Sequence, residues 1–98
     1  MLIPTRNVLK RTIMLLIAAT RGGPMRLQIL RLLEKTPYNI NEIASTLNID
    51  YKTAQHHIRV LEKSRLVVSS GEKYGNNYNL STLMKEHIDI LNDVGKSS

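Results

Sequence analysis

The sequence contains no cysteine, tryptophan or phenylalanine, and its four tyrosines are the only aromatic residues among 98. Without cysteine the chain has neither a disulfide framework nor a thiolate metal site, which fits a protein kept in the cytoplasm. With so few aromatic residues, its core must be aliphatic. An apolar content of 42% is sufficient for the core of one small domain at this length, but not of two.

A long hydrophobic run is also missing. The longest one, Ile13–Ala19, is far too short to cross a bilayer. Basic residues precede it, as in a signal peptide, but Thr20–Pro24 (TRGGP) follows it in place of a small-residue cleavage site. We therefore expect a helix of a cytoplasmic protein and no membrane partner.

Acidic residues are absent from the first 33 positions, although these positions carry five arginines and one lysine. The whole chain has a formal net charge of +6 and a pI near 9.9. Such a basic balance favours a polyanionic partner. From Leu80 onward the balance turns slightly negative, so the excess positive charge belongs to the earlier part of the chain.

The usual signatures of catalysis are missing too. No nucleophile-and-base constellation, no phosphate-cradling glycine loop followed by lysine and no pair of carboxylates on one helix face is present. Three histidines suggest a metal, but side chains of adjacent helical residues diverge by about 100°, which separates His56 from His57. His87 lies on an apolar stripe. We therefore expect that the protein is not an enzyme and that it has neither a cofactor nor a metal site.

The stretch Asn41–Leu66 predicts two short helices joined by a tight turn. Asn41 is placed to cap the first helix. The apolar positions of that helix recur at helical spacing: Ile43, Ala44 and Leu47. Asn48 follows where the chain leaves the helix, and asparagine tolerates the left-handed conformation that such an exit requires. Asp50 is the expected N-cap of the second helix.

The second helix, about residues 51–63, separates into two faces. Its apolar side carries Ala54, Ile58 and Leu61, with His57 and Val60 on the flank. The opposite arc carries cations with amide, imidazole and phenol groups, and only Glu62 interrupts it at the edge: Tyr51, Lys52, Gln55, His56, Arg59 and Lys63. Because these groups hydrogen-bond to base edges and phosphates, the arc predicts contact with nucleic acid. The alternative is a solvated polar face, as on any surface helix.

The N-terminal segment, about residues 5–20, predicts a helix with more apolar surface than one helix at the edge of a small domain can bury. Its stripe consists of Leu9, Ile13, Leu16 and Ile17. We expect it to pack against another subunit, and the alternative is that it crosses the core of its own domain. Gly22 and Gly23 end this helix, and Pro24 opens the next one, which runs to about Lys35.

Beyond Arg65 the periodicity becomes strand-like. Residues 66–70 and 78–80 flank a segment rich in glycine and asparagine, which predicts a β-hairpin. Ser81 is the expected cap of a last helix that extends to Val94.

In the helix at residues 51–63, we expect the His57 side chain to pack against the core, because it lies on the flank of the apolar side.

Three helices followed by a hairpin form the winged helix-turn-helix arrangement, and the sequence resembles that family, in particular its archaeal and bacterial ArsR-like transcription regulators. The resemblance covers about residues 21–80. Its matching residues are RGGPMRLQILRLL, then Ile43-Ala44, Leu47-Asn48-Ile49, Thr53–Ile58, Leu61-Glu62 and Leu66-Val67. Members usually have glycine at the position of Asn48 and often at that of Arg65. Arginine in a left-handed turn costs about 1 kcal/mol.

The resemblance implies a mainly helical α+β fold in a single domain. Residues 24–80 would form the DNA-binding core with a two-stranded wing, and the extra helices at 5–20 and 81–94 would join two protomers. Four residues at the wing tip would reach phosphates or the minor groove: Lys73, Tyr74, Asn76 and Asn77. Arg26 would flank the phosphate backbone. The residues expected at the dimer interface are Leu9, Ile13, Leu16, Ile17, Leu83, His87 and Leu91.

Together these features predict a sequence-specific, double-stranded-DNA-binding transcription regulator that acts as a homodimer. The helix at residues 51–63 would enter the major groove, and the wing at 71–77 would lie at the backbone or minor groove. The alternatives are a winged-helix protein–protein interaction module of a nucleoprotein complex and an RNA-binding protein. The sequence identifies neither an operator nor an effector.

Overall fold

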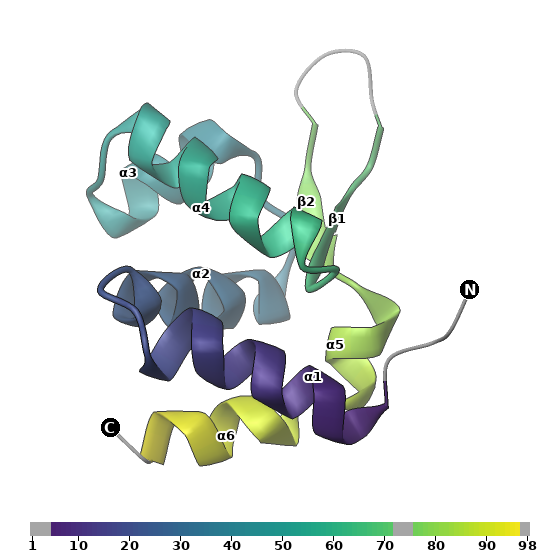
Figure 1. Cartoon of the computed structure of the whole chain (residues 1–98). Helices are drawn as coiled ribbons and strands as arrows, with labels where there is room; N and C mark the ends of the chain where they lie inside the picture. The colour runs from purple at the N-terminus through teal and green to yellow at the C-terminus, as the bar shows by residue number, and fades with distance from the viewer. Residues whose placement is uncertain (1–4, 72–75, 97–98) are drawn as a thin grey trace.

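The computed structural model describes residues 5–71 and 76–96 and has the expected mainly helical fold with a small hairpin. Its elements are α1 (Arg6–Ile13), the π-helix η1 (Met14–Ala18), α2 (Gly23–Lys35), α3 (Ile40–Leu47), α4 (Tyr51–Lys63), β1 (Val67–Ser69), β2 (Tyr78–Leu80), α5 (Thr82–Glu86) and α6 (Asp89–Lys96). Helix α2 lies in the middle, with α3 and α4 on one side of it and α1 and α6 on the other (Figure 1).

The core is aliphatic, as the scarcity of aromatic residues predicts. Residues at helical spacing on α2 and α4 are completely or almost completely buried in it: Ile29, Leu30, Leu33, Ala54, Ile58 and Leu61. The apolar side of α4 is therefore fixed against the rest of the domain. Its opposite side must face outward.

Helix α3 begins at Ile40, so its N-cap lies two residues earlier than the predicted cap, Asn41. Its N-cap is Asn39, whose side chain accepts a hydrogen bond from the Glu42 backbone N–H at 2.8 Å. The Glu42 carboxylate accepts one in return from the Asn39 N–H at 2.9 Å. This capping box satisfies two donors at once. The predicted Asn41 cap is wrong because only Asn39 has a glutamate three residues later.

Left-handed residues end both helices of the motif. Asn48 has φ 56° and ψ 47°, and Arg65 has φ 66°. In each case the next N–H reaches back five residues, from Ile49 to Ala44 O at 3.0 Å and from Leu66 to Leu61 O at 2.9 Å. These are Schellman motifs, and they stop each helix at a defined residue. Between them, Asp50 caps α4 by accepting a hydrogen bond from the Thr53 N–H at 2.7 Å, as predicted.

The N-terminal segment is not one uniform helix. After α1 the chain widens into η1, where the Ala19 N–H donates to Met14 O at 3.1 Å. A wider turn rotates less per residue and thereby brings Ile17 back toward the face that carries Leu9 and Ile13. All three side chains are buried.

The C-terminal segment differs from the single helix expected over residues 81–94. Ser81 caps α5 as predicted, accepting from the Met84 N–H at 3.1 Å, but the helix ends at His87. The His87 ring nitrogen Nδ1 bonds to Leu83 O at 3.0 Å. Helix α6 then runs along α1 (Figure 1), and Arg6 forms an ion pair with Asp89.

The two strands pair in an antiparallel register, with Val67 opposite Leu80 and Ser69 opposite Tyr78. Tyr38, just before α3, adds a bridge to the second strand: its N–H donates to Tyr78 O at 3.1 Å, and the Tyr78 N–H donates to Tyr38 O at 2.8 Å. The second strand is therefore attached, at its end nearest the hairpin loop, to the segment that enters the motif. Over the described residues, no helix is both long enough and apolar enough to cross a membrane.

Candidate nucleic-acid interface

Helix α4 exposes a continuous polar face. Four exposed cationic or imidazole side chains recur at helical spacing along it: Lys52, His56, Arg59 and Lys63. Tyr51 is 46% exposed at the start of the helix, and Gln55 is half-buried one turn later. Glu62 is the only acidic residue on this helix. The structure thus brings together on one surface all six residues that the sequence assigned to nucleic-acid contact on this helix.

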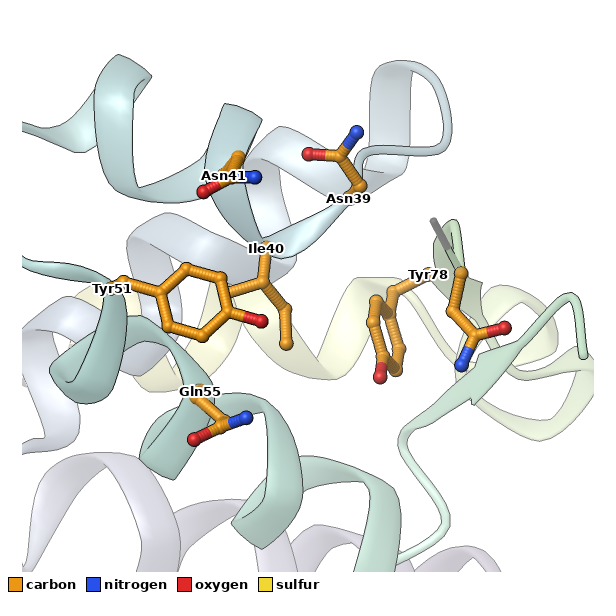
Figure 2. A pocket seen from close by; sticks show the side chains of 7 residues that line it. Asn39, Ile40, Asn41, Tyr51, Gln55 and Tyr78 are labelled. Atoms are coloured by element: carbon orange, nitrogen blue, oxygen red, sulfur yellow. The ribbon is translucent and has the colours of Figure 1, made fainter. Parts of the chain in front are cut away.

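A hollow of about 250 Å³ lies between the start of α3, the start of α4 and β2. It is lined by Asn39, Ile40, Asn41, Tyr51, Gln55, Asn76 and Tyr78. Figure 2 shows the phenols of Tyr51 and Tyr78 on either side of it, with the Gln55 amide between them. Amide and phenol groups hydrogen-bond to base edges, sugars and phosphates. The hollow therefore extends the polar face of α4 toward the base of the wing.

Three of the polar lining residues were not predicted from the sequence: Asn39, Asn41 and Tyr78. Asn39 and Asn41 precede or open a helix, where asparagine ordinarily serves as a cap, so their residue types alone indicate structure. Tyr78 belongs to a strand that pairs with a segment beside the motif, and only that pairing places it here.

Asp50 lies next to this surface, but its carboxylate serves as the N-cap of α4. Hydrogen bonds from the side chain and backbone of Thr53 hold the pKa of the Asp50 carboxyl below its usual range. A carboxylate at a helix N-terminus is also favoured by the helix dipole. The negative charge at the start of α4 therefore stabilises the helix, and the cations that face outward lie from Lys52 onward.

Arg26 does not lie on this surface. It is 9% exposed, and its guanidinium donates to His57 Nδ1 at 3.2 Å and to Leu16 O at 3.0 Å. The prediction that Arg26 flanks the phosphate backbone is therefore wrong, because its donors are used inside the domain. His57 is buried, as predicted for a packing residue. Burial, then the charge of Arg26 and then His56, lowers the pKa of His57.

Of the predicted wing-tip residues, Lys73 and Tyr74 lie outside the described residues. Asn76 is described and exposed, and it lines the hollow beside Tyr78. The wing therefore contributes at least one amide near α4.

The predicted dimer-interface residues separate into two groups. Leu9, Ile13, Ile17 and Leu91 are buried in the protomer's own core, so they are not available to a partner. Leu16, Leu83 and His87 are half-buried. The apolar side chains that the N-terminal segment does expose are Val8 at 51%, Met14 at 38% and Leu15 at 57%. The alternative, that the stripe crosses the domain's own core, is correct for its inner residues.

The histidines form no metal site within the described ranges. No group of three histidine, aspartate or glutamate side chains there is arranged to hold an ion. The rings of His56 and His57 are tilted by 55° with centroids 5.6 Å apart. His57 points inward to Arg26, whereas His56 is exposed.

Comparison with known proteins agrees with this geometry. Residues 23–69 match the family model of bacterial regulatory proteins of the arsR family. No curated protein matches the chain. Among solved structures, the homodimeric winged helix-turn-helix DNA-binding domain of a possible ArsR-family transcriptional regulator from Mycobacterium bovis is similar, with a TM-score of 0.70 and 21% identity over 91% of this chain and 79% of that one.

Two HlyU proteins are also similar. HlyU from Vibrio cholerae has a TM-score of 0.69 and 28% identity over 91% of this chain and 95% of that one. The transcriptional regulator HlyU from Vibrio vulnificus has a TM-score of 0.67 and 26% identity over 91% of each chain. Residues 23–69 therefore match the arsR family of bacterial regulatory proteins, and the fold of the chain is that of winged helix-turn-helix domains.

Proposed function

We propose that this protein is a sequence-specific regulator of transcription that binds double-stranded DNA as a homodimer. The observation that carries the proposal is the polar face of α4, which is cationic, exposed and fixed in direction by a buried apolar side. A solvated surface helix ordinarily carries both signs of charge, whereas this face carries one acid among its cations. We propose no catalytic activity, and a cytoplasmic location follows from access to DNA.

In this proposal α4 enters the major groove. Gln55 can form a bidentate pair with an adenine edge, and Arg59 or Lys52 can pair with guanine. Tyr51 suits a phosphate or a thymine methyl group at the start of the helix, and Lys63 suits a phosphate. The hollow beside Tyr51 and the wing at residues 71–77 would then lie over the sugar–phosphate backbone or the minor groove.

The homodimer is supported by surplus apolar surface and by a relative. Val8, Met14 and Leu15 are exposed on the N-terminal segment, on the side of α2 away from α4. The similar domain from Mycobacterium bovis is homodimeric. A symmetric pair would hold two copies of α4 about 34 Å apart and would bind an inverted repeat.

The test begins with selection of bound duplexes from a random pool, followed by titration of the selected duplex across salt concentrations. We expect an inverted repeat and a steep loss of affinity with salt, because each neutralised phosphate releases counterions. Gln55→Ala should relax the sequence preference at one position in each half-site. Lys63→Ala should weaken all duplexes alike and lower the salt slope by about 1.

Lys85→Ala is the matched control, because Lys85 is exposed on α5, away from α4 (Figure 1). It should change neither preference nor slope. Absent or salt-insensitive binding to duplex DNA would favour the protein-interaction module instead. Preference for structured RNA over duplex DNA would favour the RNA-binding alternative.

A further inference from the structure

Arg26 forms a buried junction between the N-terminal segment and the motif. Its Nη1 donates to Leu16 O at 3.0 Å in η1 and to Thr20 Oγ1 at 3.2 Å in the turn that follows. Its Nε donates to His57 Nδ1 at 3.2 Å in α4. All three acceptors are neutral groups. One side chain of α2 therefore holds the end of the first helical segment and the middle of α4 together.

The contact with η1 has an electrostatic reason. Leu16 O lies near the C-terminus of η1, where carbonyl groups lack partners within the helix and carry partial negative charge. The guanidinium of Arg26 supplies a donor and a compensating positive charge at that place. Thr20 Oγ1 also donates to Leu16 O, at 2.8 Å, and thereby fixes the turn to the same carbonyl. Arg26 thus caps the end of the N-terminal segment.

The contact with α4 depends on the state of His57. Its Nδ1 accepts from Arg26, so this nitrogen carries no proton and the ring is neutral. Arg26 faces the ring from α2, the His56 ring lies beside it on α4, and Gly22 packs against its edge. Because His56 faces outward while His57 points inward, the bond to Arg26 holds α4 at one rotation about its axis.

The junction has little free space. A Cβ added at Gly22 would lie 2.9 Å from His57 Cε1 and 3.2 Å from Arg26 Nη2. A Cβ added at Gly23 would lie 1.6 Å from Ile17 O. Close-packed groups of this kind transmit displacement, since no void absorbs it. A shift of η1 would therefore reach His57 through Arg26.

We infer that Arg26 is a positioning residue that couples the setting of the N-terminal segment to the orientation of α4 through His57. The inference rests on the proposed function, in which a second protomer packs on the N-terminal segment and α4 binds DNA. In such a dimer the junction would set the spacing at which two α4 helices meet two half-sites. Affinity for one half-site would depend on it far less.

The test compares two substitutions at His57. His57→Asn places an amide oxygen where Nδ1 stands and keeps an acceptor for Arg26, whereas His57→Leu keeps bulk and removes the acceptor. Each variant is titrated against a single half-site and against inverted repeats with varied spacers, built from the selected duplex. For His57→Leu we expect roughly tenfold weaker binding at the preferred spacing, a broader choice of spacers and half-site affinity within about threefold. His57→Asn should behave as wild type.

A second measurement requires no DNA. Thr20 and His57 are joined only through Arg26 in the bonds described above, so Thr20→Val and His57→Leu form a double-mutant cycle. We expect the effect of one substitution on the unfolding equilibrium constant to change at least about threefold when the other is present. Arg26→Lys, which keeps the charge but loses the fork of donors, should remove this coupling.

The inference is overturned if the two His57 variants lose affinity equally, if half-site and repeat affinities fall together, or if the cycle shows no coupling. Wild-type protein that binds no duplex would defeat the proposed function alone. Coupling between Thr20 and His57 in that case would still establish Arg26 as the link between the two segments.

Discussion

Helix α4 and the N-terminal segment α1–η1 differ in how much apolar surface they expose. Both bury one side completely, through Ile58 on α4 and Ile13 on α1. On the outside, α4 presents cations and the Gln55 amide, whereas α1–η1 exposes large apolar side chains such as Val8 and Leu15 beside cations such as Lys10. An exposed polar face suits a hydrated polyanion, and an exposed apolar face suits another protein surface. The difference supports the proposal that the two segments bind different partners, DNA and a second protomer.

The two surfaces are also separated in space. Helix α2 lies between them, and Figure 1 shows α4 and the hairpin on one side of it and α1 and α6 on the other. Either partner can therefore bind without covering the surface used by the other. The following substitutions affect one surface, the other, or the contact between them.

The largest effect is expected where the N-terminal segment meets α2. In Gly23→Ala the added Cβ would overlap the backbone of Ile17, which has no flexible end to move aside. We expect the free energy of unfolding to fall by about 3 kcal/mol, at the upper end of the range for overpacked sites. Urea denaturation measures this. Gly22→Ala is the control, and it should lose less stability because the nearest atoms are the ends of side chains. Equal losses of stability in the two variants would show that the backbone moves to relieve the overlap at Gly23.

The next effect concerns the apolar face. Leu15→Asp places a charge on a side chain that is 57% exposed, so the fold should lose at most about 0.5 kcal/mol. If this face holds the second protomer, dimer affinity should fall by about 2 kcal/mol or roughly 30-fold, as for an interface hot spot. Sedimentation equilibrium measures the change. Val68→Asp, on a valine of β1 that is 48% exposed, should leave dimerisation unchanged.

A smaller effect is expected in the turn before α4. Asn48 adopts the left-handed conformation, so Asn48→Ala should reduce the free energy of unfolding by about 1 kcal/mol. Asn48→Gly should be almost neutral, because glycine adopts this conformation without a steric cost. Chemical denaturation of both variants distinguishes conformational strain from loss of the asparagine side chain. Equal destabilisation by alanine and glycine would point to the side chain.

The smallest effect concerns pH and the contact between the two segments. The pKa of His57 is lowered in the folded protein, so the unfolded chain binds a proton first as the pH falls. Stability from neutral His57 should be fully present above about pH 6.5 and decline as the pH falls below it toward the folded pKa. Urea midpoints at several pH values, compared with those of His57→Asn, isolate this contribution. If His57→Asn has the same pH profile as wild type, His57 is not the source of the pH dependence.

Sequence reasoning succeeded where structure is decided locally. Asp50 and Ser81 cap the helices that follow them, and Asn48 takes the left-handed conformation, because each depends on residues within one turn. The predicted cap of α3, Asn41, was wrong. The reciprocal hydrogen bond with Glu42 selects Asn39 from the two nearby asparagines. The inward direction of His57 followed from helical spacing alone.

Predictions failed where distant segments decide the outcome. Arg26 is typical of an exposed cation by residue type, and its burial depends on His57, 31 residues away in the chain. The apolar surplus of residues 5–20 was recognised, but the burial of Leu9, Ile13 and Ile17 inside the protomer depends on the packing of distant helices against this segment. The predicted single helix over residues 81–94 is also interrupted at His87, after which α6 packs on α1.

The packing of α6 on α1 has a consequence for the order of folding. Arg6 and Asp89 are 83 residues apart in sequence, so contacts between these helices close almost the whole chain into a loop. Closing this loop is entropically costly until folding of α2, α3 and α4 has reduced its effective length. During synthesis, the inner face of α1 stays uncovered until Ile90 and Leu91 have emerged. We therefore expect a surface built on α1 to mature last, which would postpone subunit assembly until the α2–α4 core has formed.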